Sequence, residues 1–416
     1  HLAYRENYHV YVIPLPTGGN PVEVGTSVDS TPMVRASGDG GNYPHWSEGG
    51  QTLNWTLGPT ALSATVTELF ARERNEEDEY ASAYTAPTGG PSLAVTLEAD
   101  MPDGRVALIN ARIITMAGED GGVIEGGVIV IDGNRIAAVG GADTPVPAGA
   151  ERVDLGGRTV IPGIIDAHAH GSHGDGFIPQ QNWQAYATLA LGVTTIFDPS
   201  NDATEIFAAA DMQRAGQILA PRIYSTGDIV YGARSAWFAE INSLDDAREH
   251  VRRLKAQGAI SVKNYNQPRR NQRQQVAVAA REEGMLTVGE GGSLFHMDLS
   301  MVADGNSAIE HNLPQSTLYD DVLQFWGQTN VAYTPTLGVT YGGISGEDYW
   351  YQASDVWKHP ILTRFVPPHV LQPRSIRRQM APWEDYYHVV SAETSKQLLD
   401  VGVNVSIGAH GQREGL

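Results

Sequence analysis

The chain has 416 residues, 41% of them hydrophobic, which is enough for a large core and for more than one domain. Its net charge of −20 argues against nucleic acid as a partner, because phosphates attract basic surfaces. The chain has no cysteine, which excludes disulfides, thiolate zinc sites and cysteine nucleophiles, so any metal must bind to His, Asp, Glu or a modified Lys.

Residues 1–100 predict an all-β segment. A strand is expected at 10–15, followed by a turn at 16–20. The stretch 44–53 has the pattern Pro-x-Trp-Ser-x-x-Gly-x-x-Leu and resembles one blade repeat of Tol-type β-propellers, in which Trp46 would pack between blades. A propeller needs several blades, so the segment is interpreted either as the tail of a propeller or as a few strands packed on the next domain.

Residues 104–162 predict a second β unit. A strand at 107–115 is followed by a hairpin at 126–140, whose turn is the Asp-Gly-Asn sequence at 132–134. A further stretch at 152–160 completes the unit. The expectation is the N-terminal part of a small β-sandwich domain that leads directly into the next strand.

Residues 163–416 alternate strands with helices, the pattern of a parallel α/β architecture. The expected strands are 164–168, 193–197, 222–225, 261–264, 286–289, 307–310, 332–336 and 403–407. Helices are expected at 183–191, 205–217, 244–257 and 273–283. Eight strands favour a TIM-type (β/α)8 barrel that lacks its C-terminal end, and a seven-stranded or doubly wound sheet is the alternative.

The first strand of this region ends in a His-x-His pair, His168 and His170. Side chains two residues apart on a strand point to the same side, so both imidazoles project together from its C-terminal end. Barrel enzymes carry their catalytic groups at these strand ends. Paired imidazoles there suit a divalent transition metal, and zinc above all.

Five of the seven later strands end in a residue that could join such a site. In chain order these residues are Asp198, Lys263, Glu290, His311 and His410. Each has a simpler structural explanation, such as a solvent-facing loop residue, and Asp198 also fits a turn that leads into a helix cap. Their common place at strand ends favours one shared metal site.

This order of motifs resembles the amidohydrolase superfamily. The matching stretches are 160–170, 192–195, 262–263 and 309–311, and the resemblance extends from about residue 106 to the C-terminus. The combination with a propeller-like segment is similar to a branch containing prolidases and imidazolonepropionase-related hydrolases. The resemblance implies that His168 and His170 bind the more buried metal, that Lys263 is carbamylated and bridges two metals, and that His311 binds the second metal.

Two positions depart from the pattern of the superfamily. Most members have a His at the end of strand five, where this chain has Glu290, and an Asp after strand eight, where this chain has His410. An exchange of the two groups would keep the number of anionic ligands constant, so Glu290 and His410 are both expected to be metal ligands. His296 is the rival ligand from strand five.

The resemblance implies a hydrolase that attacks an amide or ester bond with a hydroxide shared by two divalent ions. His410 would accept the proton, since an ordinary imidazole pKa near 6.5 suits a base at neutral pH. Four residues in loops on the same face are expected to bind a small-molecule or short-peptide substrate: Tyr231, Arg234, Tyr265 and Tyr341. Arg234 could bind a carboxylate, with a plain surface arginine as the alternative.

Two other functions stay open: a mononuclear deaminase of the same superfamily and a non-catalytic binding protein with a decayed site. No apolar run reaches the roughly 18–20 residues of a membrane span, and no Gly-x-Ser-x-Gly elbow or phosphate-binding loop is present. The resemblance to Tol-type propellers predicts a periplasmic or secreted protein. A homo-oligomer or a complementing chain is the partner expected to complete the barrel.

Overall fold

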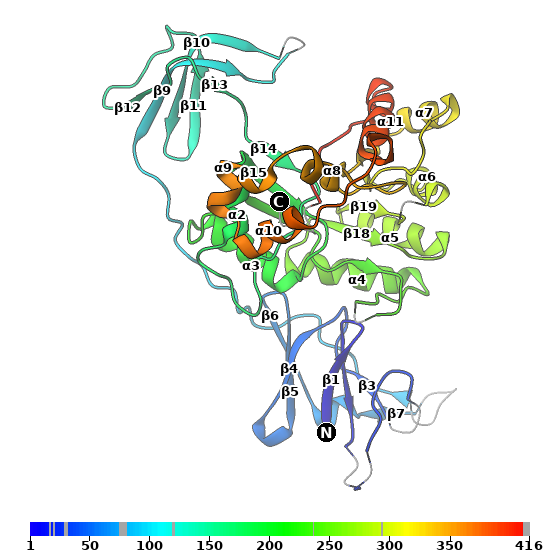
Figure 1. The fold of residues 1–416 in the computed structure, drawn as a ribbon. Coiled ribbons are helices and arrows are strands. Elements are labelled where there is room, and N and C mark those ends of the chain that lie inside the picture. Colours follow the sequence, from blue (N-terminus) through cyan, green and yellow to red (C-terminus); the bar gives the residue numbers. More distant parts are fainter. Residues whose placement is uncertain are drawn as a thin grey trace.

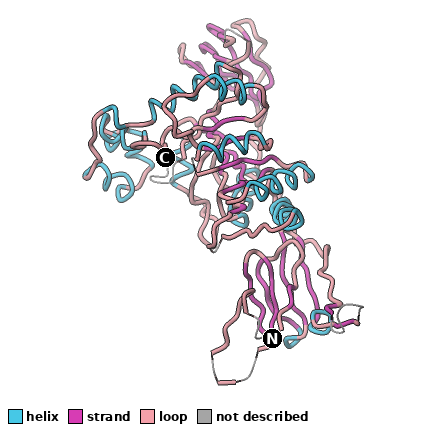
Figure 2. Tube along the Cα trace, turned by 90° about the vertical axis from the view of Figure 1, so that its right-hand side faces the viewer, coloured by secondary structure: helices cyan, strands magenta, loops and turns pink. Residues whose placement is uncertain are grey.

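The computed structural model describes residues 1–410 apart from 16–17, 20, 29–31, 75–80, 119–120, 236 and 293. The turn expected at 16–20 therefore lies largely outside the described residues. Figure 1 shows an α/β body with one small β region at its N-terminal end and a second small sheet, β9–β13, on its opposite side. The N-terminal region consists almost entirely of strands and loops (Figure 2).

The start of the chain is rich in β-strands, as expected. Its strands are β1 (Leu2–Glu6), β2 (His9–Ile13), β3 (Val34–Arg35), β4 (Asn42–Ser47), β5 (Thr52–Leu57), β6 (Thr60–Thr65), β7 (Arg72–Glu73) and β8 (Ala81–Ser82), with the short helices η1 (Glu48–Gly50) and α1 (Val66–Leu69). They form small antiparallel sheets, and a shared core with Val10, Leu53 and Trp55 lies between β1–β3 and β4–β6. Trp46 packs against this core, but the strands do not by themselves show a propeller.

The second β unit forms around one long strand. β9 (Arg105–Ile114) pairs with β10 (Val123–Asp132), which pairs in turn with β11 (Arg135–Gly140), and β12 (Glu151–Asp154) and β13 (Thr159–Val160) lie parallel to β9. The predicted hairpin turn is confirmed: Asp132 pairs with Arg135, and Gly133 has a φ of +58°, which glycine adopts without strain.

The α/β body contains two parallel sheets. The first orders β14 (Ile164–Asp166), β15 (Val193–Asp198) and β16 (Arg222–Ser225), and the second orders β17 (Val230–Tyr231), β18 (Ser261–Tyr265), β19 (Leu286–Glu290), β20 (Ala308–Glu310) and β21 (Ala332–Thr334). The intervening helices are α2 (Trp183–Ala190), α3 (Ala203–Arg214), α4 (Leu244–Gln257), α5 (Arg270–Glu282), α6 (Phe295–Ala303) and α7 (Asp320–Gly327). The predicted alternation of strands and helices is confirmed.

Helix α4 illustrates why these boundaries could be predicted. Ser243 caps its first turn in a capping box with Asp246, and Gly258 ends it with a φ of +115°. Its buried face carries Val251 and Leu254, which pack in the largest buried apolar cluster of the body. Local capping signals and the helical period therefore agree.

The segment 403–407 differs from the prediction, since it forms no regular strand. Val405 makes a single parallel bridge to Tyr333 of β21, and the N–H of Ala167, just after β14, donates to the carbonyl of Ile407 at 2.8 Å. The segment thus lies between the last strand of one sheet and the first strand of the other. These pairings bring the ends of both sheets together, whereas the eight-stranded barrel stays a prediction.

A helical insertion between β21 and 403–407 was not predicted. It contains α8 (Gly346–Ala353), η2 (Val356–Lys358), α9 (Pro360–Phe365), α10 (Pro368–Ile376), η3 (Trp383–Asp385) and α11 (His388–Asp400). Leu362 and Leu371 pack against Ala187 of α2, so α9 and α10 cover that helix (Figure 1). Within the described part of the chain, no helix combines the length and apolar character needed to cross a bilayer.

Candidate metal centre

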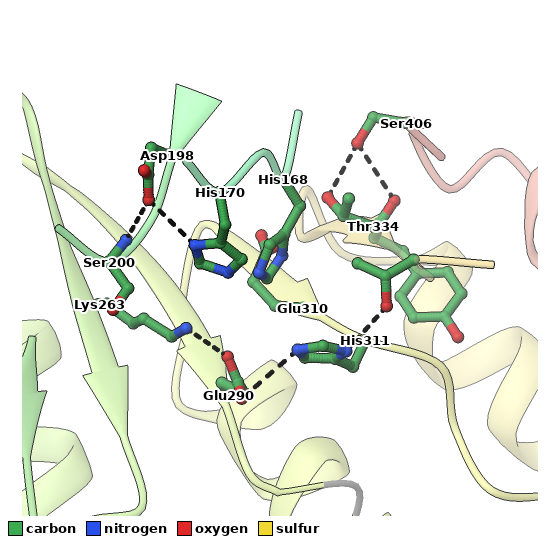
Figure 3. Close-up of polar contacts among 12 residues, drawn as sticks. His168, His170, Asp198, Ser200, Lys263, Glu290, Glu310, His311, Thr334 and Ser406 are labelled. Carbon is green, nitrogen blue, oxygen red and sulfur yellow. Dashed lines mark hydrogen bonds and ion pairs between the residues drawn. The ribbon is translucent and has the colours of Figure 1, made fainter. Parts of the chain in front are cut away.

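Four imidazoles meet at the C-terminal ends of the parallel strands: His168, His170, His311 and His410. The ring centroids of the neighbouring pairs lie between 4.4 and 5.1 Å apart. His168 and His170 follow β14, and His311 follows β20 (Figure 3). His168 is completely buried, and His311 and His410 are nearly so. So many imidazoles packed together, most of them buried, indicate a site built for a common ligand.

Three of these rings are held by a hydrogen bond at Nδ1. The partner of His168 is Glu310 Oε2 at 2.5 Å, that of His170 is Asp198 Oδ1 at 3.2 Å, and that of His311 is Thr336 Oγ1 at 2.8 Å. An anchored Nδ1 fixes the ring and leaves Nε2 available, which is the usual arrangement behind a metal-binding imidazole.

The free nitrogens of the cluster fit a metal ion. Among the described residues, His168 Nε2, His170 Nε2 and His410 Nδ1 are buried without a hydrogen-bond partner, and His311 Nε2 has only Glu290 Oε1 at 3.5 Å. A buried polar atom without a partner is costly, and a bound cation would remove that cost. Two sets of three ligands have their donor atoms within 4.8 Å of one another: His168, His170 and His410, and His168, Glu290 and His311. Nitrogen donors with one carboxylate suit zinc.

Lys263 and Glu290 form an ion pair at the edge of the cluster. Lys263 Nζ lies 2.6 Å from Glu290 Oε2, and both side chains are at most 5% exposed. The chain Lys263–Glu290–His311 is visible in Figure 3. In this ion pair Lys263 is an unmodified lysine, so its carbamylation stays a prediction.

Burial controls the protonation of the cluster. Burial, followed by the charge of Lys263, lowers the pKa of His168 well below its ordinary value and that of His311 to about 3. Burial and the neighbouring imidazoles lower the pKa of His410 to about 2. All three rings are therefore neutral at pH 7, the form that binds metals. Burial also raises the pKa of Glu310 to about 8.

The backbone brings the first and last segments of the body into contact. Asp166 Oδ1 accepts hydrogen bonds from the N–H groups of His168 (3.1 Å) and Ala409 (3.0 Å), and the N–H of His410 donates to the carbonyl of His168 (2.8 Å). Gly408 allows this approach, because a Cβ there would lie 2.5 Å from His168 Cβ. His410 itself has a φ of +52°, an unusual value for a non-glycine residue that often marks a functional position.

The structure brings together all six predicted metal ligands: His168, His170, Lys263, Glu290, His311 and His410. The rival ligand His296 lies outside the cluster, since it is exposed on α6 and its recorded ring contact is with Phe295. Asp198 fits both of its predicted roles, because its Oδ1 accepts from the N–H of Ser200 and also meets His170 Nδ1.

Three of the four predicted substrate residues lie beside the cluster. The rings of Tyr231 and Tyr265 stack 5.0 Å apart, Lys263 Nζ lies 4.9 Å from the Tyr265 ring, and the Tyr341 ring is 5.1 Å from His311. Arg234 is exposed, and no contact with the cluster is recorded for it among the described residues. The geometry therefore gives more support to an aromatic wall than to an arginine that binds a carboxylate.

Sequence reasoning missed Glu310 and Thr336 as partners of the imidazoles. Glu310 directly precedes His311, and a carboxylate in an otherwise apolar strand was a signal that could have identified it. Thr336 carries no such signal, because its pairing with His311 depends on the path of the chain after β21.

Comparisons with known proteins agree with this geometry, although no family model matches the chain. The imidazolonepropionase of Erwinia tasmaniensis is 32% identical over 157 residues, 36% of this chain and 31% of that protein. The imidazolonepropionase of Sphingopyxis alaskensis is 47% identical over 66 residues, 16% of each chain, and the enamidase of Eubacterium barkeri is 40% identical over 77 residues, 18% of this chain and 20% of that protein. The chain thus spans between 16% and 31% of the length of these relatives.

Solved structures show the same fold. Phenylurea hydrolase B has a TM-score of 0.53 at 17% identity, covering 73% of this chain and 74% of its own. A Xaa-Pro dipeptidase with bound methionine has a TM-score of 0.52 at 17% identity, covering 75% and 81%. The chain has the mixed α/β fold of these hydrolases, and its relatives in sequence are amidohydrolases.

Proposed function

We propose that this chain belongs to the amidohydrolase superfamily and hydrolyses an amide bond of a small molecule or short peptide with two divalent metal ions, zinc being preferred. One observation carries the proposal: buried imidazole nitrogens from three separate segments converge without a hydrogen-bond partner. The relatives in sequence and the structural neighbours support the reaction class at a coarse level. An ester is the alternative substrate bond.

The ligand sets suggest how two ions would be held. His168 belongs to both sets but has a single free nitrogen, Nε2, because Nδ1 is bonded to Glu310. A second ion therefore needs a further ligand. Lys263 would provide it as a carbamate, whose two oxygens can join two metals, beside Glu290 and His311.

Bound metal ions would polarise the scissile carbonyl and lower the pKa of an attacking water. His410 would accept the proton at its buried, unpartnered Nδ1 and return it to the leaving nitrogen. Burial lowers its pKa to about 2 in the metal-free chain, so it would be a weaker base than the ordinary imidazole expected from the sequence. Tyr231, Tyr265 and Tyr341 would form one wall of the substrate site and exclude water from it. With Lys263 in the ligand set, His410 is free for this role.

The architecture proposed with this function is a (β/α)8-type barrel whose eight strands are β14–β16, β18–β21 and 403–407. The pairings of Val405 and Ile407 with both sheets support it. The corresponding domains are 1–100, the tail of a propeller; 104–162, part of a β-sandwich; and 163–416, the barrel. A periplasmic or secreted location goes with the propeller interpretation.

A second candidate, a mononuclear deaminase, has one specific observation in its favour. The pair between Lys263 and Glu290 already balances both charges, which leaves His168, His170 and His410 to bind a single ion. In that case Lys263 stays an ammonium group, and His410 is a ligand.

The deciding experiment is metal content per chain by plasma mass spectrometry, on protein purified without added metal, together with a screen of dipeptides, cyclic amides and esters. About two equivalents support the binuclear hydrolase, and about one supports the deaminase. His296→Asn is the matched control, because it removes an exposed imidazole outside the cluster and should bind as much metal as wild type. No metal, even after adding zinc and bicarbonate, would leave a binding protein and overturn both catalytic proposals.

A further inference from the structure

The tip of the first β-hairpin is unusual because its turn carries a buried tyrosine. Asn7 and Tyr8 connect β1 to β2, and both have positive φ values, 47° and 71°. Glycine is the common residue at such turn positions, since a larger side chain is strained there. Tyr8 is nevertheless only 4% exposed. A strained residue that is also buried indicates that its side chain has a specific task.

Tyr8 inserts into the α/β body rather than into the N-terminal sheets. Its ring packs in the cluster formed by α4 and β18, and the guanidinium carbon of Arg253 lies 3.8 Å from its centroid. Arg253 is fixed in turn by Asp228, with Nη1 2.7 Å from Oδ2. The hairpin tip is thus held in place by buried charged and apolar contacts.

The hydroxyl of Tyr8 reaches the loop that follows β17. It donates to the carbonyl of Trp237 at 3.2 Å. The described residues of this 232–240 loop, which are 232–235 and 237–240, return to the end of β17, where the N–H of Ala239 donates to the carbonyl of Tyr231 at 2.9 Å. Burial raises the pKa of Tyr8 to about 12, so the hydroxyl keeps the proton it donates.

The start of this loop touches the candidate metal centre. The Tyr231 ring stacks on Tyr265, and the N–H of Gly232 donates to the carbonyl of Tyr265 at 3.0 Å. The Tyr265 ring lies against Lys263. Two stacked rings and one short loop therefore connect the hairpin tip to the site.

We propose that Tyr8 is a positioning residue: its hydroxyl holds the 232–240 loop so that Tyr231 stays stacked on Tyr265 beside the metal centre. The N-terminal β segment then shapes the substrate side of a site to which it contributes no ligand. The consequence for substrate binding rests on the proposed function, whereas the fixing of the loop does not.

The test compares Tyr8→Phe with Tyr4→Phe in the full chain. Tyr8→Phe keeps the ring and its contact with Arg253 and removes only the hydroxyl. Tyr4→Phe is the matched control, because it removes a hydroxyl on the same hairpin that bonds to Met33 within the N-terminal segment. Hydrogen exchange of the 232–240 loop, measured without substrate, should be faster by about threefold to tenfold in Tyr8→Phe alone, the effect of one lost hydrogen bond.

If the screen finds a substrate, KM should rise by about the same factor in Tyr8→Phe while kcat and metal content stay as in wild type. Unchanged exchange in the loop of a folded Tyr8→Phe protein overturns the proposal, whatever the activity. Faster exchange with an unchanged KM overturns the link to substrate binding. A chain without metal or activity but with faster loop exchange would refute the proposed function and leave the role of Tyr8 standing.

Discussion

Replacement of Glu310 tests whether the buried carboxylate behind His168 serves a metal ion. Glu310 is 3% exposed, and its Oε2 lies 2.5 Å from Nδ1 of His168, which belongs to both candidate ligand sets. Loss of such a partner weakens metal binding by about 10-fold to 100-fold, which is about 1.4 to 2.7 kcal/mol. Both ligand sets should weaken together, because both depend on the orientation of one ring.

The two substitutions at Glu310 should differ. Glu310→Gln keeps an oxygen acceptor but loses the negative charge, so we expect about 10-fold weaker zinc binding. Burial raises the pKa of Glu310 to about 8, so at pH 7 the metal-free protein holds it mostly neutral, and Gln should change folding stability little. Glu310→Ala also leaves His168 Nδ1 without a partner and should approach 100-fold.

The assay is competition for zinc with a chromophoric chelator. Asp228→Asn is the control for the loss of a buried carboxylate, since Asp228 pairs with Arg253 outside the cluster; it should lower stability and leave zinc affinity unchanged. Wild-type zinc affinity in Glu310→Ala would refute the assignment of His168 as a ligand oriented by Glu310.

Three further outcomes follow from the structure. Gly408→Ala should lose metal, because its Cβ would lie 2.5 Å from His168 Cβ and force the two segments apart, at a stability cost of about 1–3 kcal/mol. Gly89→Ala is the control, because Gly89 has open space around it, and its metal content by mass spectrometry should equal that of wild type. Burial lowers the pKa of His250 to about 3, so below about pH 6.5 the unfolded chain takes up a proton that the folded chain does not. The free energy of unfolding should therefore fall from pH 6.5 towards pH 3 by up to about 1.4 kcal/mol per pH unit. Urea unfolding at pH 7 and pH 5 should show a smaller loss of stability in His250→Gln than in wild type. An equal loss in both proteins would contradict the buried, neutral imidazole. Zinc loading should release about one more proton per chain, measured with a pH-stat, when bicarbonate carbamylates the ammonium of Lys263 with loss of water, and no difference would point to the single-ion site.

Local sequence signals predicted those parts of the fold that depend on neighbours in the chain. The Asp-Gly turn at 132–134 is a hairpin because its backbone conformation is decided within four residues. Helix α4 begins and ends where its capping residues stand, at Ser243 and Gly258. The convergence of the candidate ligands could be predicted for a related reason: each lies in or just after a parallel strand or the segment 403–407, and the C-terminal ends of parallel strands meet at one edge.

The parts that were missed depend on contacts between distant segments. The helices α9 and α10 of the unpredicted insertion pack on α2 through contacts such as Leu362 against Ala187, a pairing that no local period reveals. The segment 403–407 has the composition of a strand but makes only a single bridge. The insertion of Tyr8 into the body, more than 200 residues away in sequence from Trp237, is equally invisible in the local pattern.

The charge balance of the cluster fits Glu290 and His410 at the two positions where the resemblance to the amidohydrolase superfamily leads us to expect His and Asp. Without metal, Lys263 pairs with Glu290, and burial favours the neutral forms of Glu310 and of three imidazoles, those of His168, His311 and His410. A bound cation would favour the ionised form of Glu310, and carbamylation would turn Lys263 from a cation into an anion. In this scheme the site would gain negative charge only when positive charge arrives, so the buried cluster would not carry a large unbalanced charge. Glu290 is central to this proposed balance, because it pairs with Lys263 and would become a ligand once metal binds; an imidazole in its place would leave Lys263 buried and unpaired.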